Sequence, residues 1–209
     1  MVNELKVEEY KIGILGLGYV GLTLSTIMAD IGFSVVGIDR DPKLISDLKN
    51  FKPHFHEKGL QQMLVLVSKK DNPPKYQVGL IDSVADIYII TVGTPILRPS
   101  LEPNLNYVRS AAEEVANVLK KGDMVILRST VPVNTTRDVV LPVLEKKNNL
   151  KAGKDFDLAF CPERTVEGKA LKELRELPQI IGGLNSQSAL RAQNLFQKIT
   201  PATINLESI

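Results

Sequence analysis

The chain contains very little cysteine and few aromatic side chains. Its 209 residues include one cysteine, no tryptophan and 5% aromatic residues. A single cysteine excludes an internal disulfide framework and any site built from paired cysteines. The shortage of aromatic rings gives no indication of a platform on which sugars or nucleic-acid bases could stack.

The chain also lacks a strong charge of either sign and a long hydrophobic run. Its 26 basic and 24 acidic residues leave a net charge of +2, which predicts no nucleic-acid partner. The apolar stretch IGILGLGYVGL (12–22) is interrupted by glycines and is too short to span a bilayer. The opening MVNELKVEEY is charged and has no apolar signal core, so we expect a cytoplasmic protein with no membrane partner.

What the sequence does contain is an alternation of short apolar runs and amphipathic stretches. The apolar runs predict strands at 10–16, 33–39, 76–81, 86–93, 124–130, 156–161, 178–183 and 202–206. The amphipathic stretches predict helices near 24–31, 41–50, 60–69, 105–119, 134–147 and 192–199. Strands this rich in Ile, Val and Leu are typical of a parallel sheet covered on both faces. The predicted fold is therefore α/β: a Rossmann-like, doubly wound, mostly parallel sheet with helices on both faces.

A glycine-rich turn joins the first predicted strand to the first predicted helix. It has the spacing Gly16-x-Gly18-x-x-Gly21, and the second strand ends at Asp39. In such a turn the first glycine allows the sharp bend, the second lets the backbone approach a pyrophosphate, and the third lets helix and strand pack closely. The free N–H groups at the helix N-terminus attract the phosphates. The pattern predicts a dinucleotide site, and a glycine-rich turn without a ligand is the alternative.

Asp39 and Arg40 bear on which dinucleotide binds. The carboxylate of Asp39 can accept hydrogen bonds from the adenosine ribose and would repel a 2′-phosphate, which favours NAD over NADP. Arg40 could accept such a phosphate and so weakens that preference. We predict NAD, although the glycine fingerprint alone would fit any nicotinamide or flavin enzyme.

Four further motifs lie where predicted strands end, which is where ligands bind in an open α/β sheet. They are TVGTP (91–95), RSTVP (128–132), CPERTVEG (161–168) and ELPQIIGG (176–183). With GLGYVGL (16–22) and PHFHEKGL (53–60), they resemble the UDP-glucose/GDP-mannose dehydrogenase family from Tyr10 to the end of the chain. The stretch 161–183 is most similar to the branch that oxidises UDP-N-acetyl-mannosamine or UDP-N-acetyl-glucosamine. Lys58 stands where the family usually has a proline.

The resemblance implies an NAD-dependent enzyme of nucleotide-sugar metabolism that supplies polysaccharide biosynthesis. Such enzymes oxidise the C6 hydroxyl of a UDP-sugar to a carboxylate in two hydride transfers. A cysteine thiolate holds the aldehyde as a thiohemiacetal, and water later hydrolyses the thioester. In the family that cysteine, with a lysine and an asparagine, lies in regions beyond this chain.

The same resemblance implies the domain organisation. Residues 1–209 would be the NAD-binding N-terminal domain, with a dinucleotide-binding core at about 10–150 and a substrate-facing extension at about 151–209. The central and C-terminal domains would be absent. The chain ends at NLESI, directly after a predicted strand and without a polar tail, so we expect a polypeptide that has been cut.

Candidate site residues also follow from the resemblance. Glu163 corresponds to a glutamate implicated in activating water for thioester hydrolysis, a task that burial would assist by raising its pKa. Thr130 corresponds to a threonine that orients a water or the cofactor near the reacting carbon. A salt-bridged glutamate and an ordinary strand-end turn are the respective alternatives. The implied cofactor-binding residues are Gly16, Gly18, Tyr19, Val20, Gly21, Asp39, Arg40, Thr91, Gly93, Thr94, Ser129, Thr130 and Glu167.

Three other residues that could carry chemistry are interpreted as structural. Cys161 matches a non-catalytic family position and has no neighbouring histidine or lysine to lower its pKa, so we expect a small buried hydrophobic residue. His54 and His56 flank Phe55, but no cluster of Cys, Asp or Glu completes a metal site around them. We therefore predict no metal.

Two functions are compatible with these features. The first is the NAD-binding portion of a nucleotide-sugar 6-dehydrogenase, inactive by itself. The second is a free-standing dinucleotide-binding module that senses NAD or pairs with another chain. A hydroxyacid dehydrogenase would share the glycine fingerprint but does not account for CPERTVEG.

Assembly is a further expectation from the resemblance. The family's dimer is built largely by its central helical region. We therefore expect the full-length protein to be a homodimer or larger. This chain alone is expected to be a monomer, with an apolar patch where the rest would dock.

Overall fold

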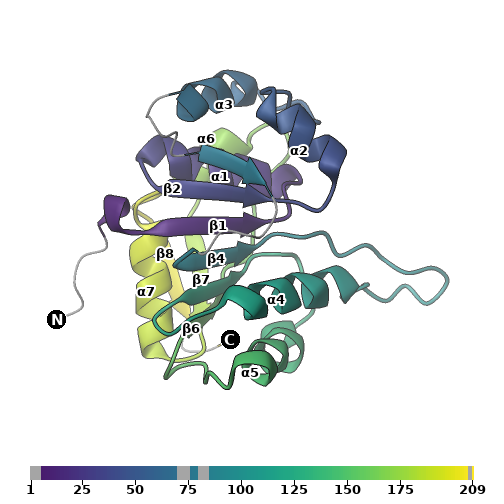
Figure 1. Ribbon diagram of the computed structural model, residues 1–209, viewed down its shortest axis with the longest axis vertical. Helices are drawn as coiled ribbons and strands as arrows, with labels where there is room; N and C mark the ends of the chain where they lie inside the picture. Colours follow the sequence, from purple (N-terminus) through teal and green to yellow (C-terminus); the bar gives the residue numbers. More distant parts are fainter. Residues whose placement is uncertain (1–5, 70–75, 80–84, 207–208) are drawn as a thin grey trace.

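The computed structural model describes residues 6–69, 76–79, 85–206 and 209, and these residues form one eight-stranded sheet in the order β3-β2-β1-β4-β5-β6-β7-β8 (Figure 1). Neighbouring strands from β3 to β6 are parallel, β7 runs antiparallel to β6, and β8 is parallel to β7. The strands are β1 (Lys11–Leu15), β2 (Ser34–Ile38), β3 (Tyr76–Gly79), β4 (Ile87–Ile90), β5 (Met124–Leu127), β6 (Asp157–Phe160), β7 (Gln179–Gly183) and β8 (Thr203–Leu206).

Helices cover both faces of this sheet. The helices are α1 (Tyr19–Ile31), α2 (Pro42–Lys49), α3 (Leu60–Lys69), α4 (Asn106–Val118), α5 (Leu141–Asn148), α6 (Ala170–Glu176) and α7 (Ser186–Phe196). A 3-10 turn (Val7–Glu9) precedes β1, and a π-helical turn (Thr136–Val140) leads into α5. Within the described part of the chain, no helix is long and apolar enough to cross a membrane.

The core is divided by the sheet into two apolar clusters. Ile87 and Ile89 of β4 belong to the cluster that includes side chains of α1, α2, α3, α6 and α7. Tyr88 and Ile90, which point to the opposite face, belong to the cluster under α4 and α5. Because successive strand residues face opposite sides and both sides are covered, the inner strands must be apolar throughout. The predicted doubly wound, mostly parallel α/β fold is confirmed.

The predicted end of α1 and the predicted cap of α2 are also found, although α1 begins at Tyr19, earlier than the apolar spacing over 24–31 suggested. Helix α1 ends at Gly32, which has a φ of +119°, and the side chain of Asp41 caps α2 by accepting from the N–H groups of Lys43 and Leu44. The part of the predicted strand 76–81 that follows Gly79 lies outside the described residues.

The later helices differ from the prediction. The helix expected over 134–147 begins with the π-helical turn, because Pro142 lacks an N–H and the amide of Leu141 bonds instead to the carbonyl of Thr136. Helix α7 begins at Ser186, earlier than the apolar spacing over 192–199 suggested, and Asn185 caps it. Helix α6, which carries the charge run KELRE, had no predicted bounds.

The strand order places an open crevice beside β1. From β1 the chain proceeds outward through β2 to β3, then returns to β4 on the other side of β1. The connections leaving the carboxyl ends of β1 and β4 therefore diverge. In doubly wound sheets this reversal point is where ligands bind.

Candidate dinucleotide-binding site

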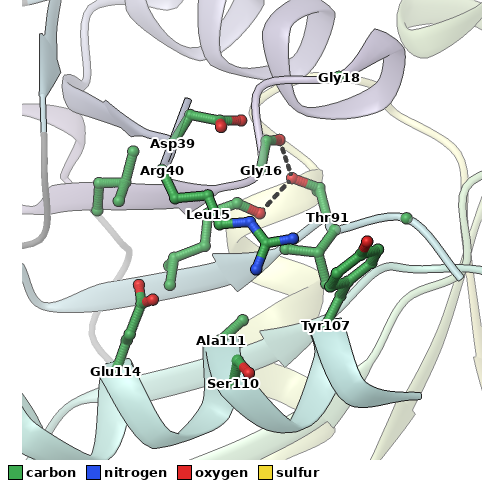
Figure 2. A pocket seen from close by; sticks show the side chains of 13 residues that line it. Leu15, Gly16, Gly18, Asp39, Arg40, Thr91, Tyr107, Ser110, Ala111 and Glu114 are labelled. Atoms are coloured by element: carbon green, nitrogen blue, oxygen red, sulfur yellow. Dashed lines mark hydrogen bonds between the residues drawn. The ribbon is translucent and has the colours of Figure 1, made fainter. Parts of the chain in front are cut away.

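A hollow of about 600 Å³ lies at the carboxyl ends of β1, β2 and β4 (Figure 2). It brings together six of the predicted cofactor residues from three separate loops. These are Gly16, Gly18, Asp39, Arg40, Thr91 and Gly93. The rest of its wall is formed by Leu15, Ile38, Val92, Tyr107, Ser110, Ala111 and Glu114.

Each glycine of the fingerprint is required for a different physical reason. Gly16 has a φ of +92°, in the left-handed region that favours glycine. A Cβ on Gly21 would lie 1.9 Å from the carbonyl oxygen of Gly16, so only glycine allows α1 to pack this closely. A Cβ on Gly18 would meet nothing within 4 Å and would stand where a ligand's phosphates approach the first turn of α1.

Asp39 lies at the end of β2, with its carboxylate fixed by backbone groups. Oδ2 accepts from the N–H of Leu17 at 2.7 Å, and Oδ1 accepts from the N–H of Asp41 at 3.0 Å. One contact ties the acid to the glycine turn and the other to the start of α2. A carboxylate held in this way suits two ribose hydroxyls and would repel a 2′-phosphate.

Arg40 reaches across the mouth of the hollow to the ring of Tyr107, with its guanidinium carbon 4.4 Å from the ring centroid (Figure 2). Glu114 lies two turns further along α4 on the same wall. Burial raises the pKa of Glu114, Arg40 partly offsets that rise, and the negative charge of Asp39 adds to it. Arg40 thus forms one edge of the hollow, beside the carboxylates of Asp39 and Glu114. Two neighbouring negative charges disfavour the binding of a 2′-phosphate there.

The α4 wall was missed by the sequence interpretation. Tyr107, Ser110, Ala111 and Glu114 follow the spacing i, i+3, i+4, i+7, which places them on one face of a helix. This wall could have been predicted, because α4 is the helix that follows β4 and its first turns must therefore border the crevice.

Hydroxyl groups of the strand-end loops hold the loops together. Thr91 donates to the carbonyl oxygens of Leu15 and Gly16, both at 2.8 Å (Figure 2). Ser129 donates to the carbonyl oxygen of Val92 at 2.6 Å. The side chains of Thr91 and Ser129 therefore fix the shape of the site, and each hydroxyl oxygen still has lone pairs that can accept a hydrogen bond.

Thr94 and Thr130 lie outside the residues that line the hollow. Thr94 donates to the backbone carbonyl of Thr130 at 2.6 Å, which joins the loop after β4 to the loop after β5. Thr130 is exposed beside this contact. Its side chain is available at the strand ends, as the proposed role near the reacting carbon requires.

The side chain of Tyr19, one of the predicted cofactor residues, lies between two loops. Its hydroxyl lies 2.8 Å from Oε2 of Glu57 and 2.9 Å from the carbonyl oxygen of Val166, so it connects two distant loops. Burial, reinforced by the hydrogen bond to Glu57, raises the pKa of Tyr19 to about 12. Tyr19 and Val20 open the first turn of α1, so the groups they can direct at a phosphate are backbone N–H groups.

Glu163 is a buried, paired carboxylate. Oε2 accepts from Nε of Arg128 at 3.0 Å, and the Glu163 side chain is only 6% exposed. Burial has the largest single effect and raises the pKa. The charge of Arg128, the N–H groups of Thr165 and Arg164, and the hydrogen bond from Arg128 together outweigh burial, so the pKa of Glu163 lies below its usual value. Burial therefore does not leave Glu163 with a raised pKa, because the charge of Arg128 and the N–H donors together outweigh its effect.

Glu167, at the end of the same loop, is exposed. Two residues earlier, the hydroxyl of Thr165 is buried without a hydrogen-bond partner among the described residues.

Cys161 is fully buried at the end of β6. Burial raises the pKa of its thiol to about 12, only partly opposed by the charge of Arg128. A thiol with so high a pKa is not a nucleophile at neutral pH.

In the described ranges, no three His, Cys, Asp or Glu residues are grouped as metal ligands would be. His54 instead packs edge-on against the ring of Phe55, with the centroids 4.9 Å apart.

The crevice, the glycine turn at a helix N-terminus and the fixed acid at the end of β2 define a Rossmann domain that binds a dinucleotide. The sequence profile "UDP-glucose/GDP-mannose dehydrogenase family, NAD binding domain" matches residues 10–200. The chain belongs to this family, and its cofactor is NAD. The open position at Gly18, next to the fixed carboxylate of Asp39, fits this cofactor.

Three relatives illustrate the similarity. UDP-N-acetyl-D-mannosamine dehydrogenase of Campylobacter jejuni is 35% identical over 193 residues, which are 90% of this chain and 47% of the relative. The enzyme of the same name from Methanococcus maripaludis is 36% identical over 197 residues, 93% of this chain and 43% of the relative. The solved UDP-D-ManNAc dehydrogenase of Pyrococcus horikoshii has a TM-score of 0.89 at 31% identity, over 95% of this chain and 47% of that one. The chain therefore spans about half the length of the curated relatives it matches.

Proposed function

We propose that this chain is the NAD-binding portion of a nucleotide-sugar 6-dehydrogenase. The substrate would be a UDP-sugar, with UDP-N-acetyl-mannosamine the first candidate and UDP-N-acetyl-glucosamine the second, oxidised at C6 to the uronate. The observation that carries this proposal is the open crevice at Gly18 and Asp39 in a chain whose relatives are named for that oxidation.

Different residues of the chain would bind different parts of NAD. The N–H groups at the first turn of α1 hold the pyrophosphate, Asp39 accepts from the adenosine ribose, and Arg40 with the α4 wall encloses the base. Bound NAD supplies the hydride acceptor. Thr130 and Glu167 border the nicotinamide end, where Glu163 contributes as an ionised carboxylate.

The first test separates cofactor binding from turnover. We expect the 209-residue chain to bind NADH, measured by the change in NADH fluorescence, and to form no NADH from any UDP-sugar. The reason is that its one thiol, Cys161, is buried and protonated. Asp39→Ala is expected to weaken NADH binding, because it removes the fixed ribose acceptor. NADH formation by this chain alone would contradict the assignment of the thiolate to another region.

The second test concerns the alternative of a stand-alone dinucleotide-binding module. The mass of the native polypeptide in its source cells distinguishes the NAD-binding portion of a dehydrogenase from the stand-alone module. A length about twice 209 residues supports the dehydrogenase, and a panel of UDP-sugars on that full chain then identifies the sugar. A length of 209 supports the module, and a partner that supplies the cysteine should then be sought.

Assembly and location are part of the proposal. Exposed apolar side chains occur near the strand ends, including Val133, which is 91% exposed, and Val166, which is 59% exposed. We expect the chain alone to sediment as a monomer, the full-length enzyme to form a homodimer or larger, and both to be cytoplasmic, where NAD and nucleotide sugars are made. A stable dimer of the chain alone in analytical ultracentrifugation would contradict the first expectation.

A further inference from the structure

Glu114 provides a carboxylate on the α4 wall of the hollow. It lies one turn beyond Ser110 and two turns beyond Tyr107, on the face of the helix that borders the hollow. Figure 2 shows its side chain pointing from α4 into the hollow, on the side of Arg40. Its neighbour Glu113, by contrast, is exposed and does not line the hollow. Glu114 is therefore placed to contact whatever fills the space between α4 and the strand ends.

The carboxylate of Glu114 has no hydrogen-bond donor within the described part of the chain. None of the described residues donates to it or forms an ion pair with it, and Arg40 acts on it only through its charge. The side chain is nevertheless partly buried, and burial raises the pKa of Glu114. Withdrawing a carboxylate from water without a donor is costly. A ligand that brings an N–H or O–H group to this wall would supply the missing donor.

The donor groups of NAD can be assigned to parts of the site by elimination. The pyrophosphate offers only acceptors and is directed to the first turn of α1, and the adenosine ribose hydroxyls are directed to Asp39. The nicotinamide amide lies at the other end of the cofactor. The remaining donor is the exocyclic N6 amine of adenine. In the proposed arrangement the base lies against α4, so this amine is the donor that comes to the wall on which Glu114 stands.

A carboxylate at this position can distinguish an amine from a carbonyl group on the base. An ionised carboxylate accepts hydrogen bonds and cannot donate them, so it binds an amine and repels a carbonyl oxygen. The hydroxyls of Ser110 and Tyr107 can donate or accept, so they suit either group. Arg40 can only donate, so it cannot accept from an amine. Of these four side chains, Glu114 is therefore the one whose chemistry is selective for N6.

We propose that Glu114 is a specificity-determining residue for the cofactor, whose carboxylate accepts a hydrogen bond from the N6 amine of adenine. The inference rests on the proposed function for the placement of the base against α4. It goes beyond that function because it concerns which base the site accepts. It predicts discrimination against a dinucleotide that carries hypoxanthine, in which a C6 carbonyl oxygen replaces the amine.

The first test compares two reduced dinucleotides on the unaltered chain. NADH and its hypoxanthine analogue, deamino-NADH, carry the same fluorescent dihydronicotinamide, so one titration method measures both. We expect NADH to bind about tenfold more tightly, because the analogue loses a hydrogen bond to a charged group and places a carbonyl oxygen against a carboxylate. Equal affinity for the two dinucleotides would overturn the inference.

The second test changes Glu114 alone. Glu114→Gln keeps the size of the side chain, and its amide can donate to a carbonyl oxygen as well as accept from an amine. We expect NADH to bind about five- to tenfold more weakly and deamino-NADH to bind at least as well as before, so that the two affinities come within about twofold of each other. Glu113→Gln is the matched control: it removes the same charge from the exposed side of α4 and should leave the tenfold preference unchanged.

These measurements distinguish recognition of the base from a purely electrostatic role. If Glu114 only balanced the charge of Arg40, Glu114→Gln would change both affinities by the same factor, and that result would overturn the inference. Glu114→Ala, which removes the acceptor without adding a donor, should also abolish the preference for NADH and decides the question if Glu114→Gln fails to fold. A chain that binds neither dinucleotide would contradict the proposed placement of the cofactor as well. No titration depends on turnover, so a full-length protein that oxidises no UDP-sugar would contradict the proposed reaction and leave this inference standing.

Discussion

The two ends of the candidate site are built in opposite ways. At the β1–β2 end, an open hollow of about 600 Å³ presents a bare glycine and a fixed acid. At the β5–β6 end, Arg128 and Glu163 are buried, and the acceptor positions of Glu163 are filled from within the protein. The first end is open to a ligand, whereas at the second end the buried charges are paired with each other.

This difference distinguishes residues that bind a ligand from residues that stabilise the fold around the site. The first N–H groups of a helix have no partner within the helix, and water satisfies them at little cost until a ligand binds. A buried charge cannot stay unpaired, so the fold surrounds Glu163 with donors. We therefore expect substitutions at the open end to change affinity and substitutions at the buried end to change stability first.

The largest effect is expected at Arg128. Arg128→Met leaves Glu163 buried without its counter-charge, which should lower the free energy of unfolding by about 3–5 kcal/mol. Arg175→Met, which breaks the exposed pair between Arg175 and Asp30, is the control and should cost at most about 1 kcal/mol. Urea unfolding of both variants gives the comparison, and equal losses would contradict it.

Gly21→Ala should have the next largest effect. The added Cβ would lie 1.9 Å from the carbonyl oxygen of Gly16 and 2.6 Å from Oγ1 of Thr91, so α1 must move. Overpacking of this kind lowers stability by about 1–3 kcal/mol. Gly79→Ala in β3, where a Cβ meets none of the described residues within 4 Å, is the matched control in the same urea experiment.

Gly18→Ala tests the open end most directly. Nothing lies within 4 Å of its Cβ, so stability should change by less than about 0.5 kcal/mol. NADH affinity should fall by about tenfold, or about 1.4 kcal/mol, because the methyl group keeps the phosphates from the backbone. A variant that loses stability and keeps its affinity would reverse the distinction between the two ends.

The pH dependence of stability gives a smaller signal from the buried end. The pKa of Glu163 is lowered in the folded chain, so its stabilising contribution is present above the pKa of the unfolded chain and is lost as pH falls through the folded value. Between pH 7 and 3, Glu163→Gln should therefore lose less stability than the unaltered chain. Equal losses in urea unfolding at the two pH values would argue against an ionised, paired Glu163.

The smallest effect is expected at Tyr107. Tyr107→Leu removes the ring that Arg40 lies against, a contact worth about 0.5–1 kcal/mol at an exposed site, so NADH affinity should fall by about two- to fivefold. Tyr10→Leu removes the similar contact with Arg191, away from the crevice, and should leave NADH affinity unchanged in the same fluorescence titration.

Much of the open end could be predicted from sequence because its signals are local. The fingerprint from Gly16 to Gly21 and the acid at Asp39 lie within one strand–helix–strand unit, so spacing alone places them together. The α4 wall with Tyr107 and Glu114 was not predicted, since which helix face borders a ligand depends on the sheet order.

The buried end was interpreted less well. Arg128 follows four apolar strand residues, and in sequence it has no visible partner. The sequence indicated only that burial, by raising the pKa of Glu163, would assist its task, whereas the neighbouring arginine and two backbone N–H groups bring that pKa below its usual value. The sequence placed Tyr19 among the cofactor residues but gave no sign that its hydroxyl joins Glu57 to Val166.

The sequence by itself determined the alternation of strands and helices, the doubly wound sheet and the cofactor turn. The reason is that the periodicity of apolar residues and the spacing of glycines are local patterns, each contained within a few residues. Only the tertiary structure decided the charge state of Glu163 and the anchoring of its loop. Arg128 and Glu163 are 35 residues apart, and Tyr19 and Val166 are 147 apart. Such pairs meet only when the sheet brings the ends of its strands together, and burial then makes their pairing obligatory.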